Sequence, residues 1–177
     1  MVVLIAVAAA VAARVASPAQ HPVRFSAAFA CGVERWSIKT LKDRPVLLPR
    51  RPATVAQLVA LTRPNPFPPP ARLPLERQIY TVVASVTLDR TEVDLDHYLV
   101  VNAGGKTMIA ETPSPVCTVG ATAYRRKQVK NAQAAARICS KARVTGVAFF
   151  DYKHGQTGVA LNAVELQPVL DFACFAG

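Results

Sequence analysis

The sequence predicts a mainly β protein with one helix, in which an OB-fold-like barrel of five strands follows a proline-rich N-terminal arm. The first observation is the order of elements, strand–strand–strand–helix–strand–strand, within about 95 residues. The second is a β-branched, alternating stretch at 79–88 that is long enough to serve two faces of a closed sheet. The alternative is a mixed α+β sheet covered by one helix, and the long first strand favours the barrel.

The strands are expected at 79–88, 97–101, 106–111, 143–150 and 163–172, with the helix at 121–140. Apolar residues occupy both registers of the first strand, so both of its faces should be covered over much of its length. The stretch from Asn102 to Gly105 is rich in residues that tolerate positive φ and predicts a hairpin between the second and third strands. Pro113 and Pro115 end the third strand.

A proline-rich arm at 20–76 precedes the barrel domain at 77–177, because nine of the fourteen prolines fall in the stretch 45–74. Proline fixes φ and lacks a backbone donor, so most of this stretch should be extended and irregular. The exception is 53–61, where Thr54 can cap a short helix with an apolar side. We expect the arm to wrap over the barrel, because its leucines and valines would be exposed in a free linker.

The first residues have the pattern of an export signal. Val2 to Ala13 is an unbroken run of twelve apolar residues, shorter than the roughly 20 residues that a membrane-spanning helix needs. Small residues at 17–19 suit cleavage by a signal peptidase, and 28–30 offers a second candidate. We therefore expect a signal peptide at 1–19 and a protein that is secreted, periplasmic or associated with the cell envelope. The alternative is an N-terminal helix that is buried or anchors the chain in a membrane.

Composition limits the class of protein. A chain of 177 residues suits one domain with an arm and excludes a large multidomain assembly. The apolar content of 51% excludes wholesale disorder, and four cysteines are too few for a dense disulfide scaffold. Lys and Arg number 21 against 11 Asp and Glu, giving a formal net charge of +10. This balance favours an anionic partner such as nucleic acid or a cell-surface polymer.

An acidic cluster between the first two strands is a candidate metal site. Glu92, Asp94 and Asp96 would point to the same side of an extended chain, because side chains alternate with period two. In an OB barrel the ends of the first three strands converge, so Glu111 at the end of the third strand can join them. Asp94, Asp96 and Glu111 are therefore the predicted ligands of a hard cation such as Ca²⁺, and no other cofactor is indicated. The alternative is a solvated acidic turn that offsets nearby basic residues.

The loop between the fourth and fifth strands contains a candidate catalytic pair. Asp151 and His154 stand beside Gly155 and Gly158, which suit a sharply turned loop. His154 could act as a general base, because the usual pKa of histidine, about 6.5, lies near the working pH. The alternative is a turn whose aspartate and histidine satisfy backbone donors. The zinc spacings of histidine and cysteine are absent from the sequence.

The predicted helix has a basic face. At about 100° per residue, four basic side chains fall within about 60° of arc, namely Arg126, Lys130, Arg137 and Lys141. No acidic residue occurs between Glu111 and Asp151, so this is the most one-signed stretch of the chain. It predicts contact with phosphates or another anionic surface. The alternative is a basic helix face that only contacts water.

An exported chain with four cysteines should form two disulfides, from three possible pairings of Cys31, Cys117, Cys139 and Cys174. A helix from 121 to 138 is about 27 Å long, so Cys117 and Cys139 at its two ends are too far apart to pair. Two pairings remain: Cys31–Cys117 with Cys139–Cys174, or Cys31–Cys139 with Cys117–Cys174. We favour the first, which would join the N-terminal arm to the exit of the third strand.

Several motifs resemble those of a family of small exported bacterial proteins, generally described as hypothetical. The motifs are Cys31-Gly-Val-Glu-Arg-Trp36, Asp94-Leu-Asp96-His97-Tyr-Leu-Val, Thr107-Met-Ile-Ala-Glu111-Thr-Pro, Gly146-Val-Ala-Phe-Phe-Asp151 and His154-Gly-Gln-Thr-Gly158. The resemblance covers nearly all of 31–172 and implies no established activity. Family members tend to have fewer cysteines, which fits a Cys31–Cys117 pair plus an additional one here. Where the family has Glu-Leu-His-Pro, this chain has Gln167, so any catalysis by that histidine would be impaired.

A weaker similarity links the chain to thermonuclease-type OB-fold nucleases. Asp94-Leu-Asp96-His97 and Glu111-Thr-Pro113 occupy places comparable to the metal-binding acids of those enzymes. The glycine of the nuclease motif is missing, as is the arginine that clamps phosphate, and Ser114 replaces the later catalytic glutamate. These departures weaken the implication of nuclease chemistry.

Three functions are compatible with the sequence. The first is an exported OB-fold protein that binds an anionic ligand through its basic helix and loops. The second is a metal-dependent phosphodiesterase with Asp94, Asp96 and Glu111 as ligands and His154 as base. The third is a structural module associated with the cell envelope. The first is preferred over the enzyme, because the nuclease pattern is incomplete.

Overall fold

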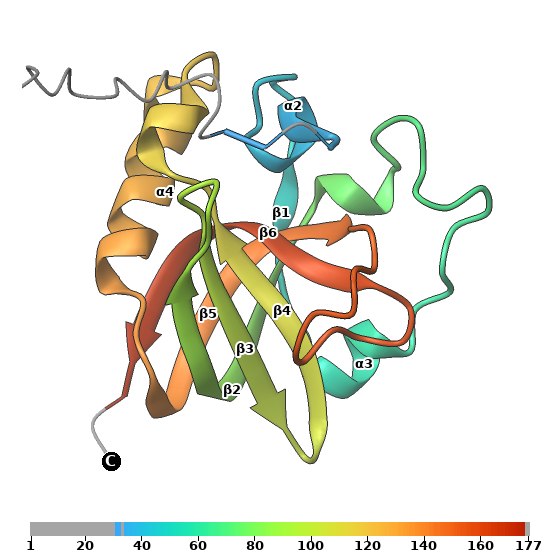
Figure 1. Ribbon diagram of the computed structural model, residues 1–177, viewed down its shortest axis with the longest axis vertical. Helices are drawn as coiled ribbons and strands as arrows, with labels where there is room; N and C mark the ends of the chain where they lie inside the picture. Colours follow the sequence, from blue (N-terminus) through green and yellow to red (C-terminus); the bar gives the residue numbers. More distant parts are fainter. Residues whose placement is uncertain (1–30, 33, 176–177) are drawn as a thin grey trace, which may run out of the picture.

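The computed structural model describes residues 31–32 and 34–175 (Figure 1). The predicted signal peptide at 1–19 and the second candidate cleavage site at 28–30 lie outside the described residues. Among the described residues, no helix is long and apolar enough to span a membrane.

Five strands close into a barrel. They are β2 (Gln78–Thr91), β3 (His97–Ala103), β4 (Lys106–Thr112), β5 (Cys139–Phe150) and β6 (Val164–Cys174). Their order around the sheet is β2-β3-β4-β6-β5, and β5 pairs back with β2 to close it. Neighbours are antiparallel except β4 and β6, which are parallel. With α4 (Ala123–Ala135) between β4 and β5, this is the topology of the OB fold, and the predicted fold class is confirmed.

The length of β2 allows the closure. Its first part, from Ile79 to Val86, pairs with β5, and its second part, from Ser85 to Thr91, pairs with β3. The register shifts where the two parts meet, between Ala84 and Leu88, so the strand bends from one side of the barrel to the other. The sequence predicted that this strand serves two sheet faces, and the structure shows how.

Two disulfides hold the ends of the described chain to the barrel. Cys31 pairs with Cys117 and Cys139 pairs with Cys174, with Cα–Cα distances of 5.6 and 6.2 Å. These are the pairings that the sequence favoured of the two left open. The first joins the segment before α2 (Trp36–Lys39) to the exit of β4, and the second joins the start of β5 to the end of β6.

The helix is shorter than predicted. It ends at Ala135, and Ala136 already has extended backbone angles, so the residues up to 140 do not continue it. The reason is tertiary pairing: β5 begins at Cys139, which lies opposite Val86 of β2. Sheet pairing overrides the local helical pattern here. Arg137 and Lys141 are therefore not on the helix.

The stretch that precedes the barrel packs on it. β1 (Leu48–Pro52) runs parallel to the start of β2 and has no second strand neighbour among the described residues. The following α3 (Val55–Val59) begins at Thr54, whose hydroxyl accepts from the backbone N–H of Gln57. Val55 and Leu58 of this helix belong to the main core inside the barrel.

Candidate functional site

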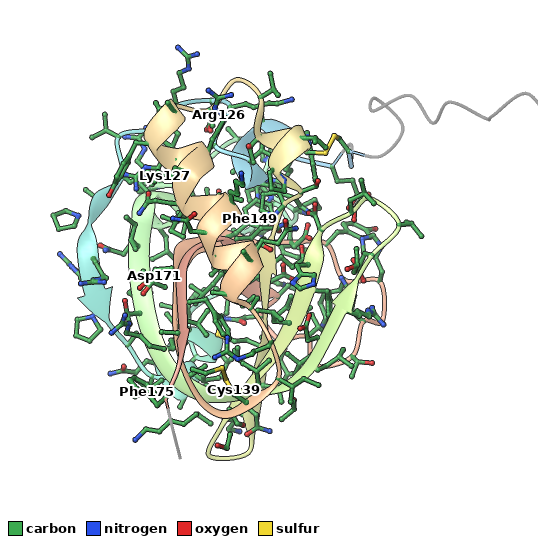
Figure 2. All side chains as sticks on the ribbon, turned by 90° about the vertical axis from the view of Figure 1, so that its left-hand side faces the viewer. Arg126, Lys127, Cys139, Phe149, Asp171 and Phe175 are labelled. Atoms are coloured by element: carbon green, nitrogen blue, oxygen red, sulfur yellow. A yellow bond between two sulfur atoms is a disulfide. The ribbon has the colours of Figure 1, made fainter. Side chains whose placement is uncertain are left out.

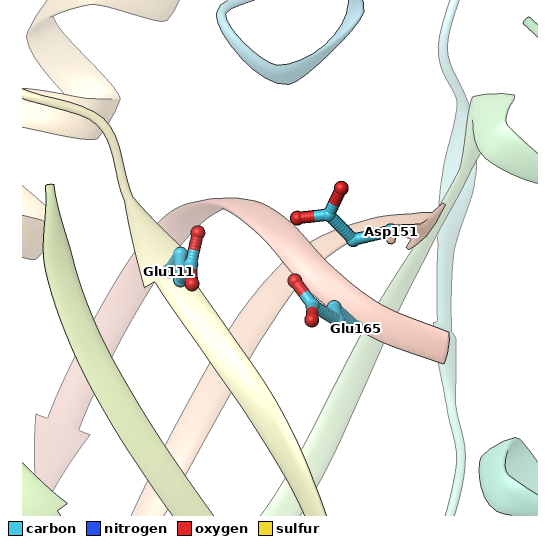
Figure 3. A group of neighbouring side chains, drawn as sticks. All are labelled: Glu111, Asp151 and Glu165. Carbon is cyan, nitrogen blue, oxygen red and sulfur yellow. The ribbon is translucent and has the colours of Figure 1, made fainter. Parts of the chain in front are cut away.

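Three carboxylates converge at one end of the barrel (Figure 3). Glu111 lies at the end of β4, Asp151 follows the last residue of β5, and Glu165 lies near the start of β6. Pairing brings them together, because Glu165 lies opposite Ile109 of β4 on one side and Phe149 of β5 on the other. One oxygen from each carboxylate lies within 4.8 Å of the other two. The close-up shows all three side chains directed toward a common point.

These carboxylates are buried to an unusual degree. The exposed fractions are 7% for Glu111, 5% for Asp151 and 1% for Glu165. Among the described residues, neither carboxylate oxygen of Glu165 has a hydrogen-bond partner. Buried carboxylates are normally hydrogen-bonded, paired with a cation or bound to a metal, because leaving a buried charge unpaired is costly. Glu165 therefore lacks a partner that its position requires.

One lysine lies beside the cluster. The Nζ atom of Lys39, at the end of α2, is 2.6 Å from Oδ2 of Asp151. Burial lowers the pKa of Lys39, but the charges of Asp151 and Glu111 outweigh it and leave the pKa raised. One ammonium group cannot neutralise three carboxylates, so the cluster keeps an excess of negative charge when all three are ionised.

That excess changes the acidity of the glutamates. Burial is the main cause that raises the pKa of Glu111, to about 8; the positive charge of Lys39 opposes this, and the charge of Asp151 adds to it. The pKa of Glu165 is raised well above its usual range, first by burial and then by the charges of Glu111 and Asp151. When no cation is bound, protons on the two glutamates neutralise part of the negative charge of the cluster.

An open pocket of about 400 Å³ leads to the cluster. Glu111 and Asp151 line its wall, whereas Glu165 is not among its lining residues and is almost fully buried. The other ionisable groups that line it are Glu34, Lys39, Glu92, Asp94 and His154. In a chain with a net charge of +10, this is an acidic hollow. It favours a cation over a free anion.

An ion pair fixes α2 above this pocket. The guanidinium of Arg35 donates two hydrogen bonds to the carboxylate of Glu76, at 2.8 and 2.6 Å, and a third to the carbonyl oxygen of Phe150. Glu76 is fully buried and also accepts from the backbone N–H of Phe150. Arg35 thus joins the start of α2 to the end of β5, which places Lys39 next to Asp151.

The predicted metal ligands are only partly brought together. The segment 92–96 is a tight turn, with the backbone N–H of Glu92 donating to the carbonyl of Asp96, and not the extended chain that period-two alternation requires. Asp94 therefore lines the pocket, while Asp96 is buried and accepts from the backbone N–H of Ser114. Of the predicted set Asp94, Asp96 and Glu111, only Glu111 belongs to the tight cluster, and metal binding by Asp94 and Asp96 stays a prediction.

The predicted catalytic pair shares the pocket but is not an interacting pair. Asp151 is engaged by Lys39, as described above. The Nε2 atom of His154 lies 3.4 Å from Oε2 of Glu34, and its ring centroid lies 4.9 Å from that of Tyr152. His154 is half-exposed at the mouth of the pocket. Its nearest acid is thus Glu34, which the sequence did not single out.

Two residues of the site were missed from the sequence. Glu165 lies in the first part of β6, which is buried and mostly apolar, and a charged residue in such a stretch was the available signal. Lys39 has no such signal, because its role depends on the Arg35–Glu76 pair that positions α2.

The predicted basic stripe is not continuous. Arg126 and Lys130 are exposed on α4, and Figure 2 labels Arg126 and Lys127 on this helix. Arg137 follows the helix and Lys141 lies in β5, with its Nζ atom 5.6 Å from the ring centroid of Phe175. The four predicted ligand-binding residues therefore belong to different elements, because the helix ends earlier than predicted.

No protein-family model and no curated protein matches the sequence. Among solved structures, one similar chain is assigned as an aspartyl-tRNA synthetase of Leishmania major Friedlin, with 14% identity and a TM-score of 0.42; the match covers 70% of this chain and 20% of that one. Another is the Entamoeba histolytica asparaginyl-tRNA synthetase, with 11% identity and a TM-score of 0.38, covering 73% of this chain and 24% of that one. This chain spans less than a quarter of either synthetase's length.

Proposed function

We propose that the chain binds a divalent cation at Glu111, Asp151 and Glu165, and that the ion presents a phosphate-containing ligand at the open side of the pocket. The supporting observation is the convergence of three buried carboxylates on one point with one lysine, among the described residues, paired to them. Three ionised carboxylates and one ammonium group leave two negative charges in excess, which one divalent ion neutralises.

The chemistry of the ligands favours a hard cation. All three are carboxylates, and Ca²⁺ binds oxygen ligands at about 2.3–2.6 Å. Two oxygens on opposite sides of such an ion are about 5 Å apart, which agrees with the 4.8 Å limit of the cluster. Glu165 would hold the ion from beneath, while Glu111 and Asp151 hold it from the wall of the pocket. Positions facing the pocket stay free for water or for a phosphate oxygen.

Thermal unfolding of the full chain with and without Ca²⁺, Mn²⁺ or Mg²⁺ tests this function. A cation at a hundredfold excess over its Kd stabilises the folded state by about 2.7 kcal/mol. For a chain of this size that corresponds to a rise in Tm of about 5–10 °C. Glu165→Gln should abolish the rise.

Asp171→Asn is the matched control, because Asp171 also lies on β6 but is half-exposed and pairs with Arg143 at 3.4 Å. This control should keep the rise in Tm. A wild-type Tm that does not respond to millimolar cation, or a Glu165→Gln protein that responds like wild type, would exclude the site.

Phosphodiester hydrolysis is a second candidate, favoured by the position of His154 at the mouth of the same pocket. Glu111, Asp151 and Glu165 would hold an ion that makes nearby water more acidic. The imidazole of His154 would accept a proton from the water whose oxygen bonds to phosphorus, while the P–O bond to the leaving alcohol breaks and the alcohol oxygen takes a proton from solvent. Hydrolysis of bis(p-nitrophenyl) phosphate with added cation tests this, comparing His154→Gln with His97→Gln. His97 lies on β3 and pairs with Asp89 at 3.4 Å, outside the pocket-lining residues. Loss of turnover in His154→Gln but not in His97→Gln supports catalysis. If the wild type shows no turnover, hydrolysis is excluded and cation binding remains as the proposed function.

We also infer that the protein acts outside the cytoplasm. Two disulfides in so short a chain are typical of proteins that fold in an oxidising compartment. Expression with its own N-terminus, followed by N-terminal sequencing of the extracytoplasmic fraction, tests both export and the predicted cleavage after residue 19. Retention of the full-length chain in the cytoplasm would contradict the inference.

A further inference from the structure

A groove lies between β1 and α4, away from the acidic pocket. It consists of two hollows of about 840 and 350 Å³ that share Leu47, Tyr124 and Arg125 as lining residues, so they adjoin. Figure 2 views this side of the molecule, with α4 facing the reader and β1 at the left edge. None of the residues that line the acidic pocket lines either hollow.

The charge of this groove is opposite to that of the acidic pocket. Arg50 and Arg125 line the larger hollow, and Arg44 and Arg125 line the smaller one. Among the described residues that line them, the only carboxylate is Asp171, and Arg143 already lies 3.4 Å from it. Arginine presents a planar fork of donors that matches a phosphate, so the groove is suited to an anionic ligand.

An exposed aromatic ring lies where the two hollows meet. Tyr124 is 65% exposed, although it is a large side chain. The guanidinium carbon of Arg125 lies 5.2 Å from its ring centroid, and Arg125 also donates to the side-chain oxygen of Gln128 at 2.7 Å. The guanidinium of Arg125 therefore lies beside the Tyr124 ring, and the exposed part of the ring is available for stacking. Aromatic rings interleaved with arginines are the usual means of binding single-stranded nucleic acids.

The other wall of the groove is β1, an edge strand of the sheet. Within the part of the chain that the structure describes, β1 pairs with β2 alone, and all five of its residues, Leu48–Pro52, are exposed. It is an addition to the five-stranded barrel and places Arg50 across the groove from Arg125. Gln128 and Asn131 of α4 add side-chain amides that can hydrogen-bond to base edges.

We propose that this groove binds a single-stranded nucleic acid, with Arg50 and Arg125 contacting phosphates and Tyr124 stacking on a base. The site is separate from the cation site and does not depend on it. An acidic peptide would satisfy the arginines but would leave the exposed ring without a stacking partner, so the ring favours a nucleic acid over a peptide.

Fluorescence anisotropy of a labelled oligodeoxythymidine of about 12 nucleotides, with the full chain in EDTA, tests the proposal. EDTA removes any contribution of the cation site. A groove that does not bind the oligonucleotide can therefore be distinguished from a cation site that does not bind its ion. The double variant Arg50→Gln/Arg125→Gln should weaken binding on the order of tenfold or more and reduce the slope of log Kd against log salt by about 1.4. Tyr124→Leu should weaken binding on the order of tenfold with an unchanged slope.

The matched control is Arg63→Gln/Lys106→Gln, which removes the same charge from exposed residues outside the groove-lining set. This control should weaken oligonucleotide binding much less than Arg50→Gln/Arg125→Gln does. Equal losses in the two double variants would overturn the proposal, because binding would then follow net charge alone. It would also be overturned if Tyr124→Leu binds like wild type and poly-glutamate competes as well as the oligonucleotide, since the groove would then accept any polyanion or an acidic peptide. Each variant's Tm, measured in the same buffer, verifies its folding.

Discussion

Replacing Asp96 by asparagine should stabilise the protein at alkaline pH and have little effect in acid. Asp96 is 1% exposed, and burial raises its pKa to about 7, with the charge of Asp94 as the next cause. The backbone N–H of Ser114 and the charge of Lys39 act in the opposite direction but do not compensate. Asparagine is neutral at every pH and keeps an oxygen to accept from Ser114.

The neighbouring Gln167 can accommodate the substitution. Its Nε2 atom lies 3.4 Å from Oδ2 of Asp96, and its Oε1 atom has no hydrogen-bond partner among the described residues. An asparagine at position 96 can donate its amide N–H to Oε1 of Gln167 after that amide turns over. The variant therefore removes a buried charge and keeps one hydrogen bond to Gln167, with the donor and the acceptor exchanged.

The size and sign of the effect follow from the pKa of Asp96. The folded protein keeps the proton up to about pH 7, while the unfolded chain releases it near the usual value of 3.8. The unfolding free energy of the wild type therefore falls as the pH rises through this window. At about 1.4 kcal/mol per tenfold change in proton affinity, the loss reaches about 4 kcal/mol by pH 8. Asp96→Asn does not undergo this loss.

Urea unfolding of both proteins in EDTA, at pH 5 and pH 8, measures the difference. The gain of the variant at pH 8 corresponds to a rise in Tm of about 10 °C for a chain of this size, and most of it should disappear at pH 5. Asp171→Asn serves as control, because that carboxylate is half-exposed. A stability difference between Asp96→Asn and wild type that is the same at both pH values would refute the reasoning.

Three further variants have direct structural consequences. Lys39→Met should lower the Tm of the EDTA-treated protein, because three carboxylates lose their ammonium partner, and should enlarge the rise in Tm on adding Ca²⁺; an unchanged Tm would separate Lys39 from the cluster. Replacing Cys31 and Cys117 by alanine should cost about 4–5 kcal/mol in urea unfolding, since the bond closes a loop of sequence separation 86; a loss below about 1 kcal/mol would show that this closure contributes little. Gly158→Ala should lower the Tm, because Gly158 has φ +81° and an added Cβ would lie 2.5 Å from a methyl carbon of Val100; a Tm equal to wild type would show that the loop rearranges freely.

The barrel could be predicted because its signals are local. The alternating pattern of β2 and the glycines of the turn before Lys106, at φ 59° and 74°, each determine the structure of their own segment. The end of α4 could not be predicted in this way. The helical pattern runs on through Arg137, and the helix stops because Cys139 pairs across the sheet with Val86. That contact joins residues far apart in the chain.

The candidate site depends on contacts that no local pattern encodes. Glu111 was predicted because it ends a strand whose position in the barrel followed from the fold. Glu165 joins it only through the parallel pairing of β4 with β6, and the acids at 92–96 are separated by a turn in which Leu95 takes a φ of 67°. Non-glycine residues rarely adopt this conformation, so the sequence favoured an extended segment there.

Salt should change the affinity of the cation site little and the affinity of the groove strongly. The carboxylates at the cation site are nearly inaccessible to solvent, so their attraction for an ion is weakly screened, and salt also reduces the repulsion from a chain of net charge +10. The groove arginines act on phosphates that release counterions on binding. Raising NaCl from about 50 to about 200 mM should therefore change the Kd for Ca²⁺ by less than about threefold and weaken oligonucleotide binding several-fold. Calorimetry for the ion and anisotropy for the oligonucleotide measure the two constants. If Ca²⁺ affinity fell as steeply as oligonucleotide affinity, the ion would be bound by exposed surface acids and not by Glu111, Asp151 and Glu165.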